Sequence, residues 1–404
     1  MHDETLADRY ARYRRIAVDR PLPLALVDMD LLDRNIETIL APARHAGKPL
    51  RVATKSVRSI DLLRHIEARG GGAVRGVMAF AAREAATLVQ RGFRDVLLAY
   101  PTARPEDARL LASANRGGAT VAVVVDDVAH LDLLDRAGAD LGATIPIVVD
   151  LDMSVGLAKG RVHLGVRRSP IRTAAGVVSL ARAAAARPHL RFHGVMGYEA
   201  QIAGLPDAVP ESRAKTAAYA LVKKLSLPHV RALRREVADA LLEAGLPCPL
   251  FNGGGTGSMH TSTTEGALTE VTAGSGFLDS HLFDHFADLP LVPASCFALQ
   301  VSRRPATGFV TCHGGGLVAS GAAGADRLPR PYLPEGLALL PQEGAGEVQT
   351  PLAVPESVGL VPGDPVFFRH AKAGELAEHF DRYLLVRGEE VVGEAETYRG
   401  GRVV

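Results

Sequence analysis

The sequence of 404 residues has no tryptophan and only three cysteines, Cys248, Cys296 and Cys312. Three cysteines cannot form a full set of disulfides, and their spacing lacks the paired pattern of a cysteine metal site. Disulfides form and persist mainly in oxidising compartments. The scarcity of cysteine therefore predicts a reducing, cytoplasmic location.

Long apolar runs and an excess of one charge are also missing. No apolar stretch approaches the length that spans a bilayer, and the acidic start of the chain lacks the apolar core of a signal peptide. The formal net charge is only +1, which gives no indication of a nucleic-acid-binding stripe or an acidic tail. We expect a cytoplasmic protein whose partners include neither nucleic acid nor membrane.

Apolar residues, in contrast, make up 47% of the chain, enough for a sizeable core. From Leu24 onward, continuous apolar β-type runs alternate with helix-like stretches, as in a parallel sheet that helices cover on both faces. Eight such units indicate the α/β fold class and a (β/α)8 TIM barrel over residues 24–286, with a doubly wound sheet as the alternative. The expected strands are Leu24–Asp28, Arg51–Lys55, Ala73–Met78, Asp95–Tyr100, Thr120–Asp126, Pro146–Asp152, Phe192–Tyr198 and Pro249–Asn252.

The composition and the pattern of the sequence change after Phe286. Glycine and proline become dense, helix-like stretches fade, and short β-type runs appear. This pattern predicts a second, mainly β domain over residues 287–404. Residues 1–23 form an N-terminal segment that precedes the first expected barrel strand and could pack on the β domain.

One lysine, Lys55, stands at the carboxyl end of an expected barrel strand. A lysine in that place can be partly desolvated, which lowers its pKa and leaves a neutral amine able to attack an aldehyde. Pyridoxal phosphate (PLP) is held by a lysine in this way, as a Schiff base. The alternative is a strand-end lysine whose ammonium reaches solvent. Position alone leaves both interpretations open.

A glycine-rich segment, residues 252–258, follows the last expected barrel strand. Its glycines let the backbone turn sharply and aim consecutive N–H groups at one point, and a hydroxyl can add a further donor. Barrels commonly bind phosphate in the loops after their last two strands, and a second small-residue loop at 274–276 could close the other side. The candidate phosphate-binding residues are Asn252, Gly254, Gly255, Thr256, Gly257, Ser275 and Gly276.

Other polar side chains fall at the ends of expected strands, where barrel enzymes place their chemistry. Tyr198 is our candidate for an acid–base group beside the cofactor ring. His163 or Arg167 is a candidate partner of the ring oxygen or the phosphate. Each of these residues could equally belong to a structural hydrogen-bond network.

In the expected β domain, His370 and His379 could bind a divalent metal, with Glu375 or Cys312 as a further ligand. The spacing of these residues is not diagnostic, and a lone pair of histidines is more often structural.

At this level of detail the chain resembles the fold-type III PLP enzymes of the D-threonine aldolase and D-serine dehydratase group, whose barrel is similar to that of alanine racemase. The resemblance extends over about residues 20–386. The segments that carry it are Pro23–Asp30, Arg51–Ser56, His193–Glu199, Gly253–Gly257, Glu270–Gly276 and Pro362–Asp364 with the following His370.

The resemblance implies that Lys55 carries PLP as a Schiff base, that the loop beginning at Gly254 holds the phosphate, and that the chain forms a homodimer. It also implies a divalent metal, Mn or Zn, near the substrate β-hydroxyl. The metal would be bound by His370 and by a ligand two residues later. Lys372 occupies that second position, and an ammonium group cannot ligate a metal. Lys372 could instead supply a fixed positive charge that polarises a hydroxyl or a carboxylate.

The implied activity is a PLP-dependent lyase that acts on D-configured β-hydroxy amino acids, by aldol cleavage or by dehydration with deamination. An amino-acid racemase is the first alternative, although Val57-Arg58-Ser59 follows the lysine where alanine-type racemases have a tyrosine and a histidine. A PLP-binding homeostasis protein and a class I aldolase for sugar phosphates are the others. Homeostasis proteins are single barrels, and the expected β domain argues against that alternative.

Overall fold

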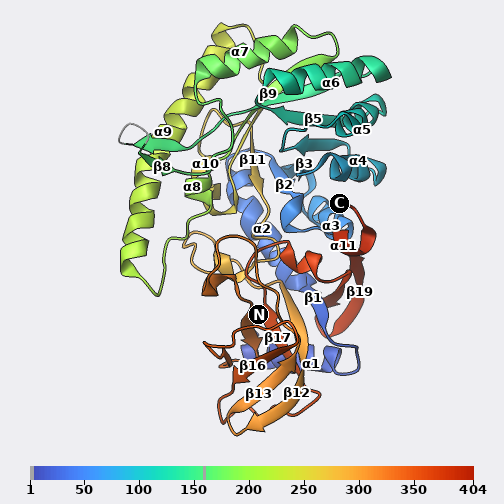
Figure 1. Ribbon diagram of the computed structural model, residues 1–404, viewed down its shortest axis with the longest axis vertical. Helices are drawn as coiled ribbons and strands as arrows, with labels where there is room; N and C mark the ends of the chain where they lie inside the picture. Colours follow the sequence, from blue (N-terminus) through green and yellow to red (C-terminus); the bar gives the residue numbers. More distant parts are fainter. Residues whose placement is uncertain (1–3, 158–160) are drawn as a thin grey trace.

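The computed structural model describes residues 4–157 and 161–404, and its upper part in Figure 1 is a closed barrel of parallel strands. Valine, isoleucine and leucine dominate these strands, and all six residues of β6 are buried, as expected where helices cover the outside and side chains fill the inside. The predicted TIM barrel is confirmed. Around the barrel the strands run β2 (Leu50–Ala53), β3 (Val74–Ala79), β4 (Asp95–Leu98), β5 (Thr120–Val125), β6 (Ile145–Asp150), β9 (Leu190–Gly197), β10 (Leu250–Gly253) and β11 (Glu270–Ala273).

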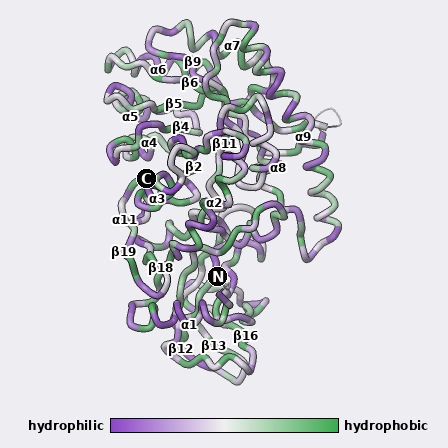
Figure 2. Tube along the Cα trace, turned by 180° about the vertical axis from the view of Figure 1, so that it is seen from behind, coloured by the Kyte–Doolittle hydropathy of each residue, from purple (hydrophilic) through white to green (hydrophobic). Residues whose placement is uncertain are grey.

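Amphipathic helices surround the barrel, and several begin at a side chain that caps their free N–H groups. Asp127 caps α6 and Thr173 caps α7 in this way. Hydrophilic and hydrophobic residues alternate along the long helix α9, which lies along one side of the barrel (Figure 2). The main helices are α2 (Met29–His45), α3 (Ile60–Gly70), α4 (Ala82–Gln90), α5 (Pro105–Arg116), α6 (Val128–Leu141), α7 (Ala174–Ala185) and α9 (Arg213–Glu243), with short helices α8 (Ala200–Ala203) and α10 (Met259–Ser262).

The second unit is a mainly β assembly below the barrel in Figure 1, as predicted. Its described strands follow the order β15-β16-β13-β12-β1-β18-β19, while β17 pairs with both β12 and β14. The strands are β1 (Leu24–Asp28), β12 (Ser295–Ala306), β13 (Phe309–His313), β14 (Arg330–Leu333), β15 (Ala338–Leu339), β16 (Gln349–Ala353), β17 (Pro365–Arg369), β18 (Arg382–Arg387) and β19 (Glu390–Glu396). The predicted domain boundary at residues 286–287 stays a prediction.

The prediction that Leu24–Asp28 opens the barrel is wrong. This strand, β1, pairs antiparallel with β12 and parallel with β18 in the second sheet. The barrel is closed instead by β11, which pairs with β10 and β2. Both sheets bury an apolar strand, so the composition of Leu24–Asp28 does not distinguish between them.

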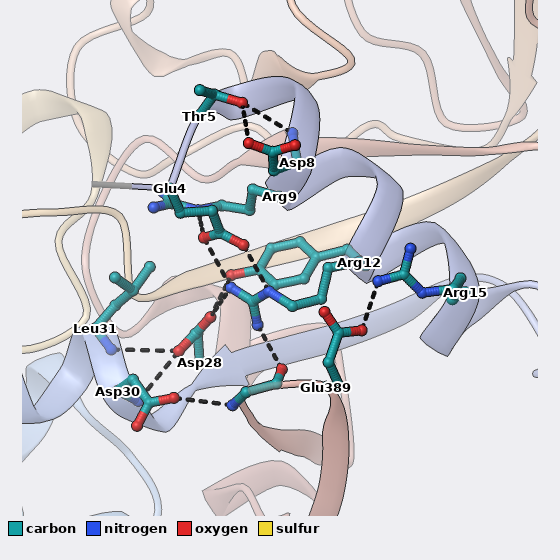
Figure 3. Close-up of polar contacts among 12 residues, drawn as sticks. Glu4, Thr5, Asp8, Arg9, Arg12, Arg15, Asp28, Asp30, Leu31 and Glu389 are labelled. Atoms are coloured by element: carbon teal, nitrogen blue, oxygen red, sulfur yellow. Dashed lines mark hydrogen bonds and ion pairs between the residues drawn. The ribbon is translucent and has the colours of Figure 1, made fainter. Parts of the chain in front are cut away.

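The N-terminal helix α1 (Leu6–Ala17) packs on this second sheet. The rings of Tyr10 and Tyr13 contact Phe367 edge-on. Arg12 lies between Glu4 and Asp28 (Figure 3), and its Nη2 is 2.8 Å from Asp28 Oδ2. Asp28 also accepts a hydrogen bond from Tyr13 and caps α2. Asp28 therefore joins α1 to β1 and α2.

No helix in the described part of the chain is long and apolar enough to cross a membrane.

Candidate active site

A cavity opens at the carboxyl ends of the barrel strands, where parallel barrels gather their functional side chains. The charged residues on its wall are Lys55 and Arg168, both cations, and no carboxylate is among the described residues that line it. The lining residues are Ala53, Lys55, Ser56, Met78, Ala79, Phe80, Ala99, Tyr100, Arg168, Met196, Tyr198, Ala203, Gly204, Asn252, Gly254, Gly255, Thr256, Thr272, Ala273, Gly274, Ser275 and Phe283. A wall with this charge suits a ligand that carries negative charge.

Lys55 lies in the short 3-10 turn η1 (Thr54–Ser56) directly after β2. Its side chain is open to the cavity, but protein atoms crowd it and remove part of its hydration. This partial desolvation lowers the pKa of Lys55, and the nearby charges of Arg168, Lys372 and Arg58 lower it further. The amine is therefore more often neutral, and a better nucleophile, than that of an ordinary surface lysine.

The turn that carries Lys55 is held from three directions. Thr54 Oγ1 donates to the carbonyl of Met78 at 2.8 Å. Arg58 adopts a positive φ of 49° and its Nε donates to the carbonyl of Lys55 at 3.0 Å. The backbone N–H of Tyr398, at the start of α11 (Tyr398–Gly401), donates to the carbonyl of Arg58 at 2.8 Å.

Tyr398 also reaches the base of the neighbouring loop. Its hydroxyl donates to Glu84 Oε1 at 2.9 Å, and Glu84 Oε2 accepts the backbone N–H of Phe80 at 2.7 Å. Because Phe80 lines the cavity, the C-terminal helix α11 supports two parts of the wall at once.

The glycine-rich loop after β10 faces the same cavity. Gly254 has a φ of 90°, a conformation that favours glycine. A Cβ added at Gly255 would lie 3.1 Å from the Tyr198 ring and 2.9 Å from Ala203, so the loop backbone packs closely against β9 and α8. Thr256 Oγ1 accepts the N–H groups of Gly274 and Gly276 at 3.2 and 3.3 Å. This hydroxyl joins the two small-residue loops into one concave surface.

A buried ion-pair network lies beneath the loop. Arg234, from α9, pairs with Glu199 and with Glu265 and donates to the carbonyl of Gly197 at 2.7 Å. Burial alone would raise the pKa of Glu199, but Arg234 and the hydroxyls of Ser262 and Ser258 outweigh it and hold this pKa below its usual value.

Glu199 in turn holds the glycine-rich loop. Its carboxylate accepts the Gly254 N–H at 3.1 Å and the Ser258 hydroxyl at 2.7 Å. The Gly254 N–H is thereby used inside the protein, and the loop is fixed before any ligand arrives.

Tyr198 is half-buried between the loop and the barrel. Desolvation raises the pKa of its phenol to about 12, and the negative charge of Glu199 contributes to this rise. Tyr198 therefore keeps its proton near neutral pH and can act only as a hydrogen-bonding phenol there.

The structure brings most of the predicted site residues to the cavity but not all of them. Lys55, Tyr198, Asn252, Gly254, Gly255, Thr256 and Ser275 line it. Gly276 lies behind Thr256, and Gly257 lines a neighbouring hollow. His163, in β8 (Val162–Leu164), which pairs with β7 (Val155–Leu157), does not line the cavity.

His370 is enclosed by protein and does not line the cavity either. Neither of its ring nitrogens has a hydrogen-bond partner among the described residues, and burial lowers its pKa to about 3. Within the described part of the chain, no three His, Cys, Asp or Glu side chains gather to hold a metal ion. One imidazole followed by an ammonium at Lys372 is not a donor set for a divalent metal, so the metal that the resemblance implied does not fit these residues.

Arg168 is the main site residue that the sequence analysis missed. Its Nε bonds Asp150 Oδ2 at 2.9 Å, and its guanidinium lies 4.9 Å from the centre of the Tyr100 ring. Burial raises the pKa of Asp150 to about 6, although Arg168 opposes the rise. The available signal was Asp150 itself, since a carboxylate at a buried strand end needs a cationic partner.

The capture of an aldehyde by Lys55 should depend on pH in a defined direction. Only the neutral amine attacks, so the rate constant of PLP incorporation into the apoprotein should rise with pH. It should level off at a lower pH than for free lysine, because the pKa of Lys55 is lowered. In Arg168→Met, which removes one repelling charge, the curve should shift to higher pH. Stopped-flow absorbance would measure both curves, and an Arg168→Met curve displaced to lower pH would contradict this account.

The chain is similar in sequence to a known family and to several enzymes. The model of a family described as "Alanine racemase, N-terminal domain" matches residues 27–277. A 3-hydroxy-D-aspartate aldolase of Paracoccus denitrificans (strain Pd 1222) is 32% identical over 260 residues, which are 64% of this chain and 60% of that protein. A D-threonine aldolase of Arthrobacter sp is 26% identical over 287 residues, 70% of this chain and 69% of the relative. The aligned region thus spans less than two thirds of the Paracoccus protein.

Similarity to solved structures extends over nearly the whole chain. The D-threonine aldolase from Filomicrobium marinum superposes with a TM-score of 0.80 at 22% identity and covers 95% of this chain and 97% of its own. The D-threo-3-hydroxyaspartate dehydratase from Delftia sp. HT23 gives a TM-score of 0.72 at 20% identity, covering 94% and 98%. At these identities the likeness establishes the fold, including the β assembly that follows the barrel.

Proposed function

The chain belongs to the alanine racemase N-terminal domain family, and from this premise we propose that it is a PLP-dependent lyase acting on D-configured β-hydroxy amino acids. The observation that carries the proposal is the cavity itself. It places an amine of lowered pKa opposite a glycine-rich loop, on a wall with no carboxylate among its described residues. An aldehyde that bears a phosphate matches both features. The names of the aldolase and dehydratase relatives support the choice of substrate class.

The residues present fit PLP at four points. Lys55 Nζ would bond the aldehyde carbon, and the cavity-lining loop residues Gly255, Thr256 and Ser275 would hold the phosphate through backbone N–H and hydroxyl groups. Tyr198 would lie beside the ring as a neutral phenol, and Arg168 would bind an anionic oxygen. His163, Gly257 and Gly276 stay predictions as direct contacts.

Bound PLP would supply an electron sink, which makes bonds at the Cα of an attached amino acid breakable. The protein's part is to orient the substrate and to move protons. Lys55, whose pKa is lowered, would serve as the base that takes a proton from the bound substrate. The enclosed apolar side of the wall, with Met78, Phe80 and Phe283, limits the access of water to that carbon.

Aldol cleavage is the reaction that these residues favour. It requires removal of the β-hydroxyl proton and rupture of the Cα–Cβ bond, and it gives glycine and an aldehyde. Dehydration must instead expel hydroxide, which needs a Lewis acid or a strong proton donor. The donor set around His370 and Lys372 does not suit a divalent metal. We therefore infer aldol cleavage as the main activity.

Reconstitution with PLP followed by a panel of D-threonine, D-serine and D-3-hydroxyaspartate tests this proposal. We expect a visible absorbance band that borohydride removes, and formation of glycine and an aldehyde from the D-isomers. Keto acid with ammonia would indicate a dehydratase. Accumulation of the L-isomer would indicate a racemase and contradict the proposal, as would cleavage of sugar phosphates without bound PLP. A homodimer and a cytoplasmic location stay predictions.

A further inference from the structure

Lys372 lies in a segment that contacts the chain beside the cavity at two points. On one side, the carbonyls of His370 and Ala371 accept N–H groups from His281 and Leu282, the residues that precede the wall residue Phe283. On the other side, a Cβ added at Gly374 would lie only 2.0 Å from the carbonyl oxygen of Lys55.

Gly374 has a φ of 86°, so the chain makes a close turn beside the cofactor-binding lysine. Lys372 lies between these two contacts and is close enough for its charge to act on Lys55. The turn therefore keeps Lys372 near the Lys55 turn, although Lys372 is not among the described residues that line the cavity.

The ammonium of Lys372 is held in place although the side chain is half exposed. Its Nζ donates to Ser320 Oγ at 2.6 Å and lies 3.4 Å from Glu375 Oε1. Ser320 in turn donates its N–H to Glu375 at 3.0 Å and its hydroxyl to the same carboxylate. An ammonium has three N–H donors, so Lys372 can hold these partners and still donate to a third group.

A positive charge at this position can replace one function of a metal but not the others. A divalent ion binds the β-oxygen of a substrate, withdraws electrons from it and orients it. A fixed ammonium can orient the oxygen and stabilise negative charge on it through a charge-assisted hydrogen bond. It cannot take part in a coordination sphere with the neighbouring His370.

We propose that Lys372 is a catalytic residue of this chain, which donates a hydrogen bond to the β-oxygen of the substrate and makes aldol cleavage independent of a divalent metal. This inference rests on the proposed function. It assigns the stabilisation of the β-oxygen to a cation that belongs to the chain and that Ser320 and Glu375 hold near the Lys55 turn.

The proton balance of the cleavage keeps Lys372 protonated throughout. The β-hydroxyl gives its proton to the neutral amine of Lys55 while the Cα–Cβ bond breaks. The bonding pair stays with Cα, and the β-oxygen becomes the carbonyl of the aldehyde. Lys55 then returns the proton to Cα, which completes glycine. Lys372 stabilises the negative charge that builds on the β-oxygen, and no other reactant is consumed.

Metal content is the first test. The purified, PLP-loaded protein should contain well under one Mn, Zn or other divalent ion per chain by mass spectrometry. Dialysis against EDTA should leave its D-threonine cleavage unchanged. A stoichiometric metal, together with loss of cleavage in EDTA and recovery with Mn²⁺, would overturn the inference.

Substitution of Lys372 is the second test. Lys372→Met should lower kcat/KM for D-threonine cleavage by about 10- to 100-fold, the usual effect of losing a hydrogen bond to a charged group. Lys372→Arg should stay within about fivefold of the parent, because it keeps the charge. Lys224→Met, at an exposed position on α9, serves as the control for removal of a surface lysine.

A substrate without a β-oxygen separates this role from a structural one. Exchange of the α-proton of D-alanine in D₂O should change less than threefold in Lys372→Met, since D-alanine has no β-oxygen to which Lys372 could donate. Equal losses in exchange and cleavage would overturn the role of Lys372 while leaving PLP chemistry intact. Absence of bound PLP and of exchange in the parent protein would instead refute the proposed function.

Discussion

The Lys55→Ala variant is expected to lose the visible absorbance of bound PLP and to lower kcat/KM for D-threonine cleavage by about 10³-fold or more. Two functions disappear with one side chain. In the proposed mechanism the amine would anchor the cofactor aldehyde, and it would move the proton between the β-hydroxyl and Cα. General acid–base catalysis by a positioned group alone contributes 10²- to 10⁴-fold. The loss should therefore be large even when PLP is supplied in excess.

The matched control for this experiment is Lys48→Ala. Lys48 lies just before β2, at the opposite end of the strand from Lys55, and donates to the carbonyl of Glu265. The Lys48→Ala variant should retain the visible absorbance of bound PLP and most of the cleavage activity. Circular dichroism should show that both variants keep the parent's secondary structure. A yellow, fully active Lys55→Ala protein would remove the basis of the proposed chemistry.

The second large effect should come from the substitution of Arg234, which is fully buried and is not among the described residues that line the cavity. In Arg234→Met, the carboxylates of Glu199 and Glu265 lose their shared cation in a buried site. Leaving a buried charge unpaired typically costs about 3–5 kcal/mol, and we expect the free energy of unfolding to fall by that amount. Urea unfolding of the apoprotein, followed by circular dichroism, measures this change.

The same substitution should weaken PLP binding, because Glu199 fixes the Gly254 N–H and the Ser258 hydroxyl. Loss of Arg234 disturbs that anchor and with it the loop. Arg235→Met, at the next and exposed position of α9, should change neither unfolding nor PLP affinity measurably. Unaltered PLP affinity in an otherwise destabilised Arg234→Met protein would show that the loop does not depend on the network.

The barrel was predictable because its strands and helices carry local signals. Local sequence determines such signals, so they can be recognised without knowledge of the fold. Examples are the continuous apolar run of residues 145–150 and the helix-capping residue Asp127. The partner of a strand is not a local property. Leu24–Asp28 was correctly read as a strand, but its pairing with β12 and β18 depends on residues some 270 to 360 positions away. That long separation explains why local patterns did not show that β11, and not this strand, closes the barrel.

The site residues likewise fall into those that the sequence could predict and those that it could not. Lys55 and the glycine-rich loop lie at strand ends, and the ends of parallel barrel strands share one face. Arg168 lies in the irregular chain between β8 and α7, where no periodicity says which of two adjacent arginines faces the cavity. Arg167 is not among the described residues that line the cavity, and its role as a partner of the ring oxygen or the phosphate stays a prediction. His163 belongs to a two-stranded hairpin whose orientation depends on tertiary contacts.

The hydrogen bonds of Tyr398 bear on how the protein matures during synthesis. This residue follows every barrel strand in the sequence, yet it holds the carbonyl of Arg58, which steadies the Lys55 turn, and the carboxylate of Glu84, which holds Phe80. A growing polypeptide can close its barrel strands well before Tyr398 emerges, but until then the lysine turn lacks this support. Under the proposed function, nascent chains should consequently bind the vitamin-derived cofactor less well before Tyr398 has emerged than after it.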